Sequence, residues 1–280
     1  MTRGLAKRLG VKDRVALLLS PSSLLRLMGY PAPRPNFRYV RASTLSAERE
    51  VISTGVSALD SILGGGVETS VVTEFVGPSG CGKTQLCHQL AVMVQLPPSS
   101  GGLGAPALYV DTEGTFRPER IALIADYRGL DPDEALERII YARAYSGDHQ
   151  EMIIDKVREV VEEYDVRLLV VDSLVGHFRS EMYADWKRAL ARLYRHASLL
   201  ARLAEDYRLA VVVTNQVTEP PGERVRGFSE HLIVATHKVW LEKVGYSRFM
   251  AKISSSPCLP PREAMFRITE VGVVGVDEPV

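Results

Sequence analysis

An eight-residue loop between an apolar run and a helical pattern has the residue types and the spacing needed to bind a phosphate. Its residues are Gly77, Pro78, Ser79, Gly80, Cys81, Gly82, Lys83 and Thr84, and Gln85 follows them. The glycines allow successive backbone N–H groups to converge on the β-phosphate of a nucleotide, and the helix N-terminus adds partial positive charge. We expect Lys83 to reach the β- and γ-phosphates and the Thr84 hydroxyl to bind Mg²⁺. Because the run at 71–76 and the pattern at 83–95 provide the strand and the helix that this motif requires, the sequence predicts a site for ATP and Mg²⁺.

A second acidic side chain is needed to hold the metal, and Asp172 has the expected position. It ends the apolar run Leu168–Asp172. In open α/β sheets ligands bind outside the carboxyl ends of the strands, so its carboxylate is expected beside the phosphate loop. The sequence therefore predicts that Thr84 and Asp172 together bind Mg²⁺.

Hydrolysis also requires a group that orients and deprotonates a water molecule. The run at 107–111 ends in Asp111 and is followed by Thr112 and Glu113, so two carboxylates are expected at the same edge as Asp172. Glu113 is the better candidate for the catalytic base, because Asp111 lies nearer the strand and a glutamate reaches further. The alternative is that Glu113 is an acid that caps the next helix beside Thr112.

The charge of the chain is balanced overall but not along its length. The 280 residues include 34 basic and 34 acidic side chains, which excludes a wholly basic nucleic-acid binder and an acidic disordered tail. Residues 1–41 contain nine Lys or Arg and one acid, Asp13, so this segment has a net charge of +8 and the remainder −8. A basic arm on an acidic body indicates an anionic partner, and a solvated pair of helices is the alternative.

The cysteines and the hydropathy indicate an intracellular setting. Cys81, Cys87 and Cys258 form neither an even disulfide framework nor a CxxC pair, and no apolar stretch approaches about 18 residues. We therefore expect a cytoplasmic protein without disulfides, zinc or membrane association. Because a helix N-terminus lowers the pKa of a thiol, a further hypothesis is that oxidation of Cys81 blocks nucleotide binding.

From about residue 50 the pattern alternates between strands and helices. Apolar runs that predict strands lie at 71–76, 107–111, 139–144, 168–172 and 209–215. Helical patterns lie at 83–95, 117–138, 148–164 and 183–207. This alternation predicts an α/β fold with a mostly parallel, twisted sheet that is covered by helices on both faces. Strands expected at 236–243, 246–254 and 263–270, with a turn at Gly245, predict a C-terminal antiparallel extension.

The first 40 residues differ in composition from the rest of the chain. The spacing of the leucines predicts short helices within residues 1–30, and three prolines between residues 31 and 35 indicate a stiff linker. The expected organisation is a short basic helical segment with a proline-rich linker at 1–40, followed by an ATPase core at 41–280.

Several strings of residues occur together along this core. They are Ile52–Gly55, Gly64–Gly66, the phosphate loop with Gln85–Leu90, Tyr109–Arg120, Val171–Leu174, Val213–Val217 and Ala264–Thr269. In this combination the chain resembles the archaeal and eukaryotic RecA-type recombinases, and within them the archaeal RadA group. The strings at 116–120 and 214–217 are specific among phosphate-loop proteins. The resemblance extends from about residue 50 to residue 272 and implies a RecA-like ATPase core.

The resemblance implies roles for the residues that match the motifs of the family. Glu113 matches the catalytic glutamate, and Lys83 neutralises the charge that develops on the transferred phosphate. Gln216 matches the glutamine that senses the γ-phosphate and relays its state to the DNA-binding loops. Arg120 matches an arginine that stacks on the adenine, with an ordinary helix salt bridge as the alternative.

The segments that match the two DNA-binding loops of the family depart from its pattern. The first, from Phe178 to Arg188, has no glycine, and a helix is expected to begin earlier there. The second, Thr218–Ser229, is shortened but keeps basic and aromatic side chains suited to single-stranded DNA. The candidate DNA-binding residues are Arg179, Lys187, Arg188, Arg224, Arg226 and Phe228.

The helix expected at 183–207 has two contrasting stripes. The apolar stripe is expected to pack in the core and consists of Tyr183, Trp186, Leu190, Leu193, Ala197, Leu200 and Ala204. The basic stripe consists of Arg188, Arg192, Arg195 and Arg202. It either contacts DNA phosphates or is a solvated helix face.

Two further departures concern contacts between subunits. Ser255 stands where the family has an aspartate that helps to cap ATP across a subunit boundary. Residues 1–30 are about half the size of the helix-hairpin-helix domain of the family, and Val40 stands where its linker has a small residue. Filament formation by the usual contacts is therefore in doubt.

These features support three hypotheses of function. The first is a RadA-type paralogue, an ATPase that binds single-stranded DNA and assists or modulates the main recombinase in repair. The second is a full strand-exchange recombinase that forms filaments. The third is a nearly non-hydrolysing interaction protein in which bound ATP acts as a conformational latch. The expected partners are single-stranded DNA, a main RadA-type recombinase or other recombination proteins, and further copies of the chain.

Overall fold

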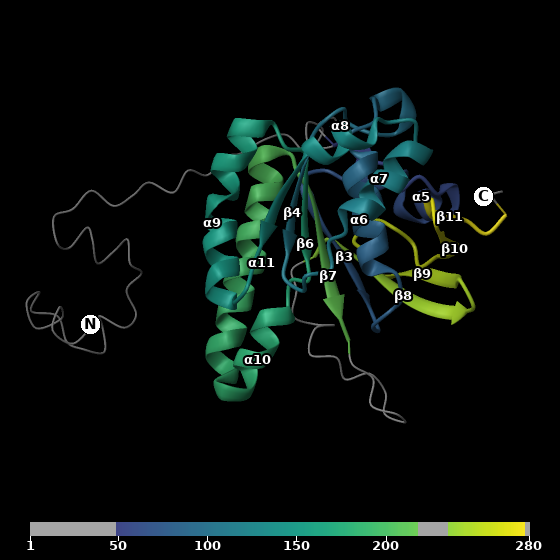
Figure 1. The fold of residues 1–280 in the computed structure, drawn as a ribbon. Helices are drawn as coiled ribbons and strands as arrows, with labels where there is room; N and C mark the ends of the chain where they lie inside the picture. The colour runs from purple at the N-terminus through teal and green to yellow at the C-terminus, as the bar shows by residue number, and fades with distance from the viewer. Residues whose placement is uncertain (1–48, 218–234, 278–280) are drawn as a thin grey trace, which may run out of the picture. The chain divides into compact units, whose positions relative to one another are not determined.

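A sheet of nine strands runs through the part of the chain that the structure describes, and helices cover both of its faces (Figure 1). The computed structural model describes residues 49–217 and 235–277. The strands of the sheet are β3 (Val71–Gly77), β4 (Ala107–Asp111), β5 (Ile139–Arg143), β6 (Leu168–Asp172), β7 (Ala210–Gln216), β8 (His237–Gly245), β9 (Arg248–Ser255), β10 (Glu263–Thr269) and β11 (Gly272–Gly275). Their order across the sheet is β11-β10-β9-β8-β3-β7-β6-β4-β5.

Parallel and antiparallel strands are segregated within this sheet. The strands from β8 to β5 in the spatial order pair in parallel. The pairs β8–β9, β9–β10 and β10–β11 are antiparallel. The predicted α/β fold with a C-terminal antiparallel extension is therefore confirmed. Strand β11 was not predicted, nor was a separate antiparallel pair formed by β1 (Val51–Ile52) and β2 (Val67–Glu68).

Successive side chains of the buried strands enter two different cores. The helices are α5 (Ser57–Leu63), α6 (Lys83–Met93), the short 3-10 helix η2 (Pro98–Ser100), α7 (Pro118–Tyr127), α8 (Pro132–Glu137), α9 (Gly147–Tyr164), α10 (Gly176–Ala184) and α11 (Trp186–Tyr207). In β6, Leu168 and Val170 pack with residues of α5, α6 and α7, while Leu169 and Val171 pack with residues of α9, α10 and α11. Because strand side chains alternate between faces, a sheet covered on both sides requires continuously apolar strands.

Two of the expected helices are divided in the structure. The pattern at 117–138 forms α7 and α8, separated by Gly129, which has a φ of +77°. Asp131 then caps α8 by accepting hydrogen bonds from two backbone N–H groups, and Pro132 follows as its first residue. The pattern at 183–207 begins earlier, as expected, but breaks at Asp185, whose side chain caps α11.

The apolar stripe of α11 is largely confirmed. Leu193, Ala197, Leu200 and Ala204 are buried, whereas Trp186 is 48% exposed because it begins the helix. Within the residues that the structure describes, none of the helices combines the length and the apolar character needed to cross a membrane. The predicted helices and linker at 1–40 lie outside the described residues, so the boundary at residue 40 stays a prediction.

The buried side chain of Gln89 joins three segments of the fold. Its amide nitrogen donates to the carbonyl oxygens of Thr54 and Val273 at 2.7 and 2.8 Å, and its oxygen accepts from the Val273 N–H at 2.7 Å. These bonds connect α6 to the segment before α5 and to β11. The adjacent Gly272 has a φ of +126°, and a Cβ there would lie 2.4 Å from Gln89 Oε1. Only glycine therefore permits this close approach.

We expect Gln89→Leu to lower the free energy of unfolding by about 3 kcal/mol or more, because three buried backbone groups lose their partners at about 1–3 kcal/mol each. Urea denaturation measures the loss. The control is Lys156→Ala, which removes an exposed ion pair to Glu159 on α9 and is expected to change little. Equal urea midpoints for the two variants would show that the Gln89 bonds do not stabilise the fold.

Candidate nucleotide-binding and catalytic site

The carboxyl ends of β3, β4, β6 and β7 border a cavity of about 400 Å³. Its lining consists of Ser79, Gly80, Gly82, Lys83, Thr84, Gln85, Glu113, Thr115, Arg117, Asp172, Gln216 and Ile268. The structure thus brings together the phosphate loop and the three more distant residues that the sequence predicts as one site. The predicted residues Gly77, Pro78, Cys81 and Arg120 lie outside this lining. Thr115, Arg117 and Ile268 were not predicted.

The phosphate loop has the backbone shape of an anion site. Gly80 and Gly82 have φ values of +75° and +96°, a conformation that side-chain-bearing residues rarely adopt. No side chain caps the N-terminus of α6, so its first N–H groups are available to a phosphate. The buried Lys83 Nζ donates to the carbonyl oxygens of Gly77 and Pro78 at 2.8 and 2.7 Å. These contacts hold the ammonium group at the loop.

Cys81, a residue of this loop, is buried at 1% exposure, and its Sγ lies 3.5 Å from Lys83 Nζ. Burial raises the pKa of the Cys81 thiol, and the opposing effect of the lysine does not reverse this direction. The expected lowering of the thiol pKa is therefore wrong, because burial outweighs the helix N-terminus.

The carboxylate of Asp172 is buried among three hydroxyl groups from three elements. Its Oδ2 accepts from Thr84 of α6 at 2.8 Å and from Tyr109 of β4 at 2.9 Å, and its Oδ1 accepts from Thr214 of β7. Burial raises the pKa of Asp172, although the three donors act in the opposite direction. Hydroxyl and carboxylate oxygens are ligands that Mg²⁺ prefers, so Thr84 and Asp172 fit a site that phosphate oxygens and water complete.

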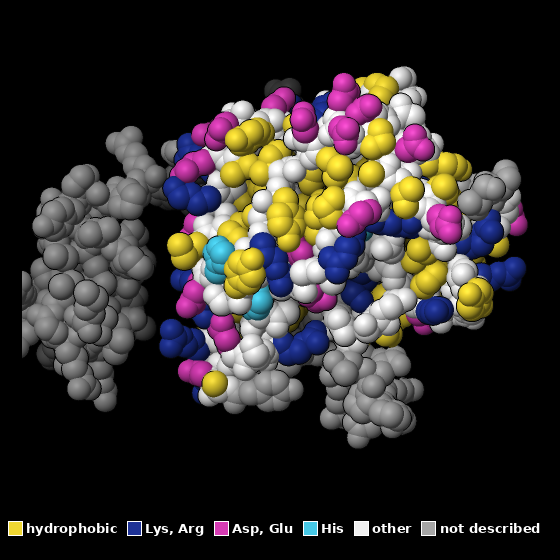
Figure 2. Space-filling model, in the orientation of Figure 1, with side chains coloured by type: hydrophobic (Ala, Val, Ile, Leu, Met, Phe, Trp, Pro, Cys, Tyr) yellow, Lys and Arg dark blue, Asp and Glu magenta, His cyan; other side chains and the backbone are white. Residues whose placement is uncertain are grey.

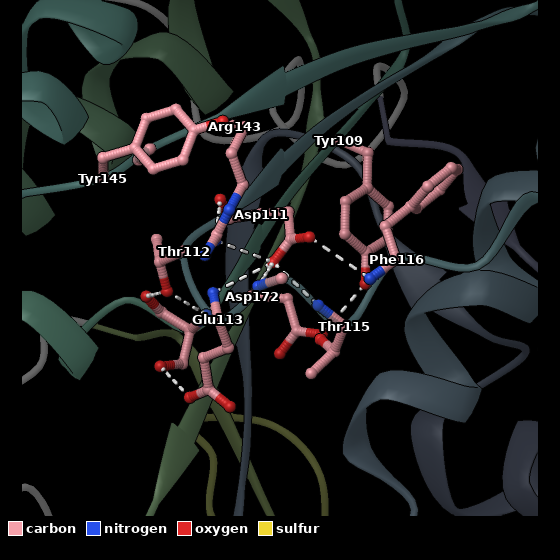
Figure 3. Close-up of polar contacts among 12 residues, drawn as sticks. Tyr109, Asp111, Thr112, Glu113, Thr115, Phe116, Arg143, Tyr145 and Asp172 are labelled. Carbon is pink, nitrogen blue, oxygen red and sulfur yellow. Dashed lines mark hydrogen bonds and ion pairs between the residues drawn. The ribbon is translucent and has the colours of Figure 1, made fainter.

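The two acids after β4 have different surroundings (Figure 3). The carboxylate of Asp111 accepts hydrogen bonds from Tyr141 and from the backbone N–H groups of Glu113, Gly114, Thr115 and Phe116. The Glu113 side chain extends away from this cluster and lines the cavity, where its Oε1 accepts from Ser173 Oγ at 2.6 Å. Asp111 therefore shapes the loop, while Glu113 is free to contact a ligand.

The alternative of Glu113 as a helix cap is wrong. Helix α7 begins at Pro118, its N-cap residue is Arg117, and no side chain makes a capping hydrogen bond there. The proline at the first position lacks one of the N–H groups that a cap would satisfy.

The hydrogen bonds to Asp111 also affect its ionisation. Burial by itself raises the pKa of Asp111. The N–H donors of Phe116, Gly114 and Thr115 lower it by more than burial raises it, so the net pKa lies below the ordinary value. Arg143 contributes an ion pair at 3.3 Å. The carboxylate is therefore ionised at neutral pH and holds the 113–116 turn in place.

A cluster of aromatic side chains, which was not predicted, contacts Asp111 and Asp172. Phe116 lies between the rings of Tyr109 and Tyr141, with both centroids at 4.9 Å, and the ring of His88 lies 5.4 Å from it. The hydroxyl of Tyr109 reaches Asp172 and that of Tyr141 reaches Asp111. Burial lowers the pKa of His88 to about 4, so its ring is neutral. The sequence signal that could have revealed this cluster is Tyr109 within an apolar strand, because a buried phenol needs a polar partner.

Gln216 ends β7 opposite Gly77 of the phosphate loop, and its half-buried side chain lines the cavity. The preceding Asn215 is fully buried and donates to Glu74 of β3 at 2.8 Å, which fixes the end of β7 against the strand before the loop. The guanidinium of Arg179 donates to the backbone carbonyl of Gln216. Arg179, predicted to bind DNA, thus links α10 to the strand end beside the cavity.

Arg120 lies beside the site rather than in its lining. Its Nε donates to Gln85 at 2.7 Å, and its two terminal nitrogens donate to the backbone carbonyls of Thr269 and Glu270. The alternative of a helix salt bridge does not describe these contacts, because the guanidinium connects α7 to the end of β10.

The remaining DNA-binding candidates divide into two groups. Lys187 and Arg188 are exposed in the first turn of α11. The other three, Arg224, Arg226 and Phe228, lie outside the described residues.

The basic stripe of α11 is only partly available to a ligand. Arg192 forms ion pairs with Asp148, Glu151 and Glu181, and its side chain is 14% exposed. Arg195 also pairs with Glu151. Arg192 is therefore not part of a solvated face, since acids of α9 and α10 pair with it, and contact of the stripe with DNA stays a prediction.

The phosphate loop lies between a buried strand and a helix at the carboxyl edge of a parallel sheet. This arrangement, with its antiparallel extension, defines a RecA-like protein of the P-loop class. The Rad51 family matches residues 47–276, and the chain belongs to this family. Over 236 residues it is 42% identical to the DNA repair and recombination protein RadA of Cenarchaeum symbiosum (strain A), a match that covers 81% of this chain and 59% of that protein. The chain therefore spans less than two thirds of the length of this relative. The resemblance found in the sequence is confirmed.

We expect Asp111→Asn to lower the free energy of unfolding by about 2 kcal/mol at pH 7, the scale of hydrogen bonds to a charged group. Because the pKa of Asp111 is depressed in the folded protein, its contribution is complete above the ordinary value of 3.8 and is lost as the pH falls through the lower folded value. Urea denaturation at about pH 7 and pH 3 should show the difference from wild type shrinking in acid. The exposed Asp155→Asn is the control, and a difference that is independent of pH would contradict the role of the Asp111 charge.

Proposed function

We propose that this protein is an ATPase of recombinational repair that binds single-stranded DNA, and that it is a RadA-type paralogue that assists or modulates a main recombinase. The observation that carries the proposal is the cavity in which the phosphate loop, Glu113, Asp172 and Gln216 converge at one sheet edge. Membership of the Rad51 family and identity to a DNA repair and recombination protein support the biological setting.

The chemistry we propose is an in-line attack of water on the γ-phosphate of ATP. Glu113 orients the water and accepts its proton as the new oxygen–phosphorus bond forms and ADP leaves with the bridging oxygen. Lys83 exchanges its two loop carbonyls for phosphate oxygens, and Gln216 contacts the γ-phosphate or the water. When bound at Thr84 and Asp172, Mg²⁺ neutralises charge on the phosphates.

Glu113→Gln is expected to bind Mg·ATP with wild-type affinity but to hydrolyse it at least about 100-fold more slowly, because the water loses its base. Lys83→Ala is expected to lose nucleotide binding itself. Fluorescent-nucleotide titration and phosphate release measure the two quantities separately. Normal turnover in either variant would overturn the assignment of the site.

The same assay distinguishes the functions when it is run with and without single-stranded DNA and paired with a mass measurement in each state. DNA-stimulated turnover without long assemblies supports the paralogue. Extended filaments in ATP together with strand exchange would identify a full recombinase instead. Negligible wild-type hydrolysis, with partner binding unchanged in Glu113→Gln, would identify an ATP-latched interaction protein.

The distribution of charge over the described residues favours one end of the protein for contact with DNA. Acidic side chains gather over the end of α7 and over α8, at the top of the face in Figure 2. They are Asp126, Asp131, Asp133, Glu134 and Glu137. Helix α10 and the end of β7 lie at the opposite end of the molecule in Figure 1. Because like charges repel, we propose that DNA contacts the α10 end, through Lys187, Arg188 and the segment that contains Arg224, Arg226 and Phe228.

We expect Lys187→Ala combined with Arg188→Ala to weaken binding of single-stranded DNA and to reduce the slope of log affinity against log salt by about 1.4, the effect of losing two phosphate contacts. Fluorescence anisotropy over a range of salt concentrations measures the slope. The matched control is Lys156→Ala with Arg158→Ala, two exposed basic residues of α9 that pair with acids. An equal effect of both double variants would show that DNA does not contact the α10 end specifically.

A further inference from the structure

The Glu113 carboxylate is held by a hydrogen bond from a neighbouring segment of the chain. The hydroxyl of Ser173 donates to its Oε1 at 2.6 Å. Ser173 is 2% exposed and directly follows Asp172, the last residue of β6, so the donor to Glu113 is the neighbour of the other acid of the site. Hydrogen bonds to an ionised carboxylate are short and are among the stronger ones in proteins.

The backbone N–H and the carbonyl of Ser173 are both hydrogen-bonded to the Thr112 side chain. Thr112 Oγ1 accepts from the Ser173 N–H at 2.8 Å and donates to the Ser173 carbonyl at 2.9 Å. Thr112 is itself the neighbour of Glu113 and is 4% exposed. The ends of β4 and β6 are therefore joined at the residues next to the Glu113 carboxylate, which fixes the backbone that carries the donor.

The first residue of α10 closes over this hydrogen bond. A Cβ at Gly176 would lie 3.0 Å from Ser173 Oγ, 3.3 Å from Thr112 Oγ1 and 3.8 Å from Glu113 Oε1. A side chain at this position would therefore press on the Ser173 hydroxyl. The start of α10 therefore lies close to the Ser173 hydroxyl.

A glutamate has a long side chain, and an unrestrained carboxylate in a cavity samples several rotamers. A donor on Oε1 restricts this freedom and leaves Oε2 to contact the water. We propose that Ser173 is a positioning residue for ATP hydrolysis, which holds Glu113 Oε1 so that Oε2 faces the attacking water. This inference rests on the role of Glu113 as the catalytic base that is proposed above.

The principal test is Ser173→Ala. We expect kcat to fall about tenfold or more, the scale of a hydrogen bond to a charged group, while KM and the affinity for Mg·ATP stay at wild-type values. The reason is that the base loses its orientation but the phosphate and metal contacts remain. Steady-state phosphate release and fluorescent-nucleotide titration measure the two effects, and urea denaturation confirms that the variant is folded.

Two further variants separate positioning from a general structural effect. Ser180→Ala is the matched control, because among the described residues the exposed Ser180 hydroxyl bonds to the His177 carbonyl of its own helix at 2.8 Å, and we expect wild-type turnover. Gly176→Ala places a methyl group 3.0 Å from Ser173 Oγ, so the hydroxyl must shift and we expect a smaller loss of kcat without loss of affinity. It also tests the proposal if Ser173→Ala does not fold.

The decisive measurement is a double-variant cycle with Glu113→Gln. If Ser173 acts through Glu113, then Ser173→Ala causes no further loss of single-turnover rate in the Glu113→Gln background. Wild-type kcat in Ser173→Ala, a parallel loss of nucleotide affinity, or full additivity in the cycle would each overturn the inference. Wild-type turnover in Glu113→Gln alone would instead overturn the proposed function.

Discussion

The buried carboxylate of Asp172 is the constraint that organises the site. A charged group in a sheet covered on both faces needs donors, and three hydroxyls from α6, β4 and β7 supply them. Each donor belongs to a segment that carries another part of the site: Thr84 ends the phosphate loop, Tyr109 precedes the turn that holds Asp111 and Glu113, and Thr214 precedes Gln216. Satisfying one carboxylate therefore sets the relative positions of all four strand ends.

The turn after β4 divides two tasks between two acids. Asp111 accepts four backbone N–H groups and cannot turn toward a ligand without releasing the loop. Glu113, two residues further on, lines the cavity instead. Helix α10 connects this turn to the end of β7, because its first residue lies beside Ser173 and its Arg179 donates to the carbonyl of Gln216. A displacement of α10 would thus affect the surroundings of both Glu113 and Gln216.

The sequence was sufficient for features that depend on local pattern. Strands β4 and β6 have the predicted bounds, because a buried strand of a parallel sheet must be apolar throughout and its polar terminus marks the edge. The phosphate loop could also be predicted, since its glycines and its lysine lie within eight consecutive residues. β11 was missed because Gly272–Gly275 is short and its burial depends on Gln89, 184 positions away in the sequence.

Side-chain partnerships between distant segments were the features that pattern did not predict. The basic stripe of α11 looked exposed by helical spacing, yet Arg192 meets acids of α9 and α10 that only the tertiary packing brings near. Cys81 had the position of an activated thiol, but its burial reverses the direction of its pKa. The hydrogen bond from Ser173 to Glu113 joins residues 60 positions apart, and no pattern in the sequence around either residue predicts it.

The contacts of Lys83 have a consequence for the thermodynamics of nucleotide binding. A lysine side chain loses about 1.5–2 kcal/mol of conformational entropy when it is fixed in one geometry. In the folded protein Lys83 is buried, and its ammonium group donates to the carbonyls of Gly77 and Pro78. The entropic cost of ordering this side chain therefore belongs to folding, so an anion that binds at the loop meets a cation that is held in place.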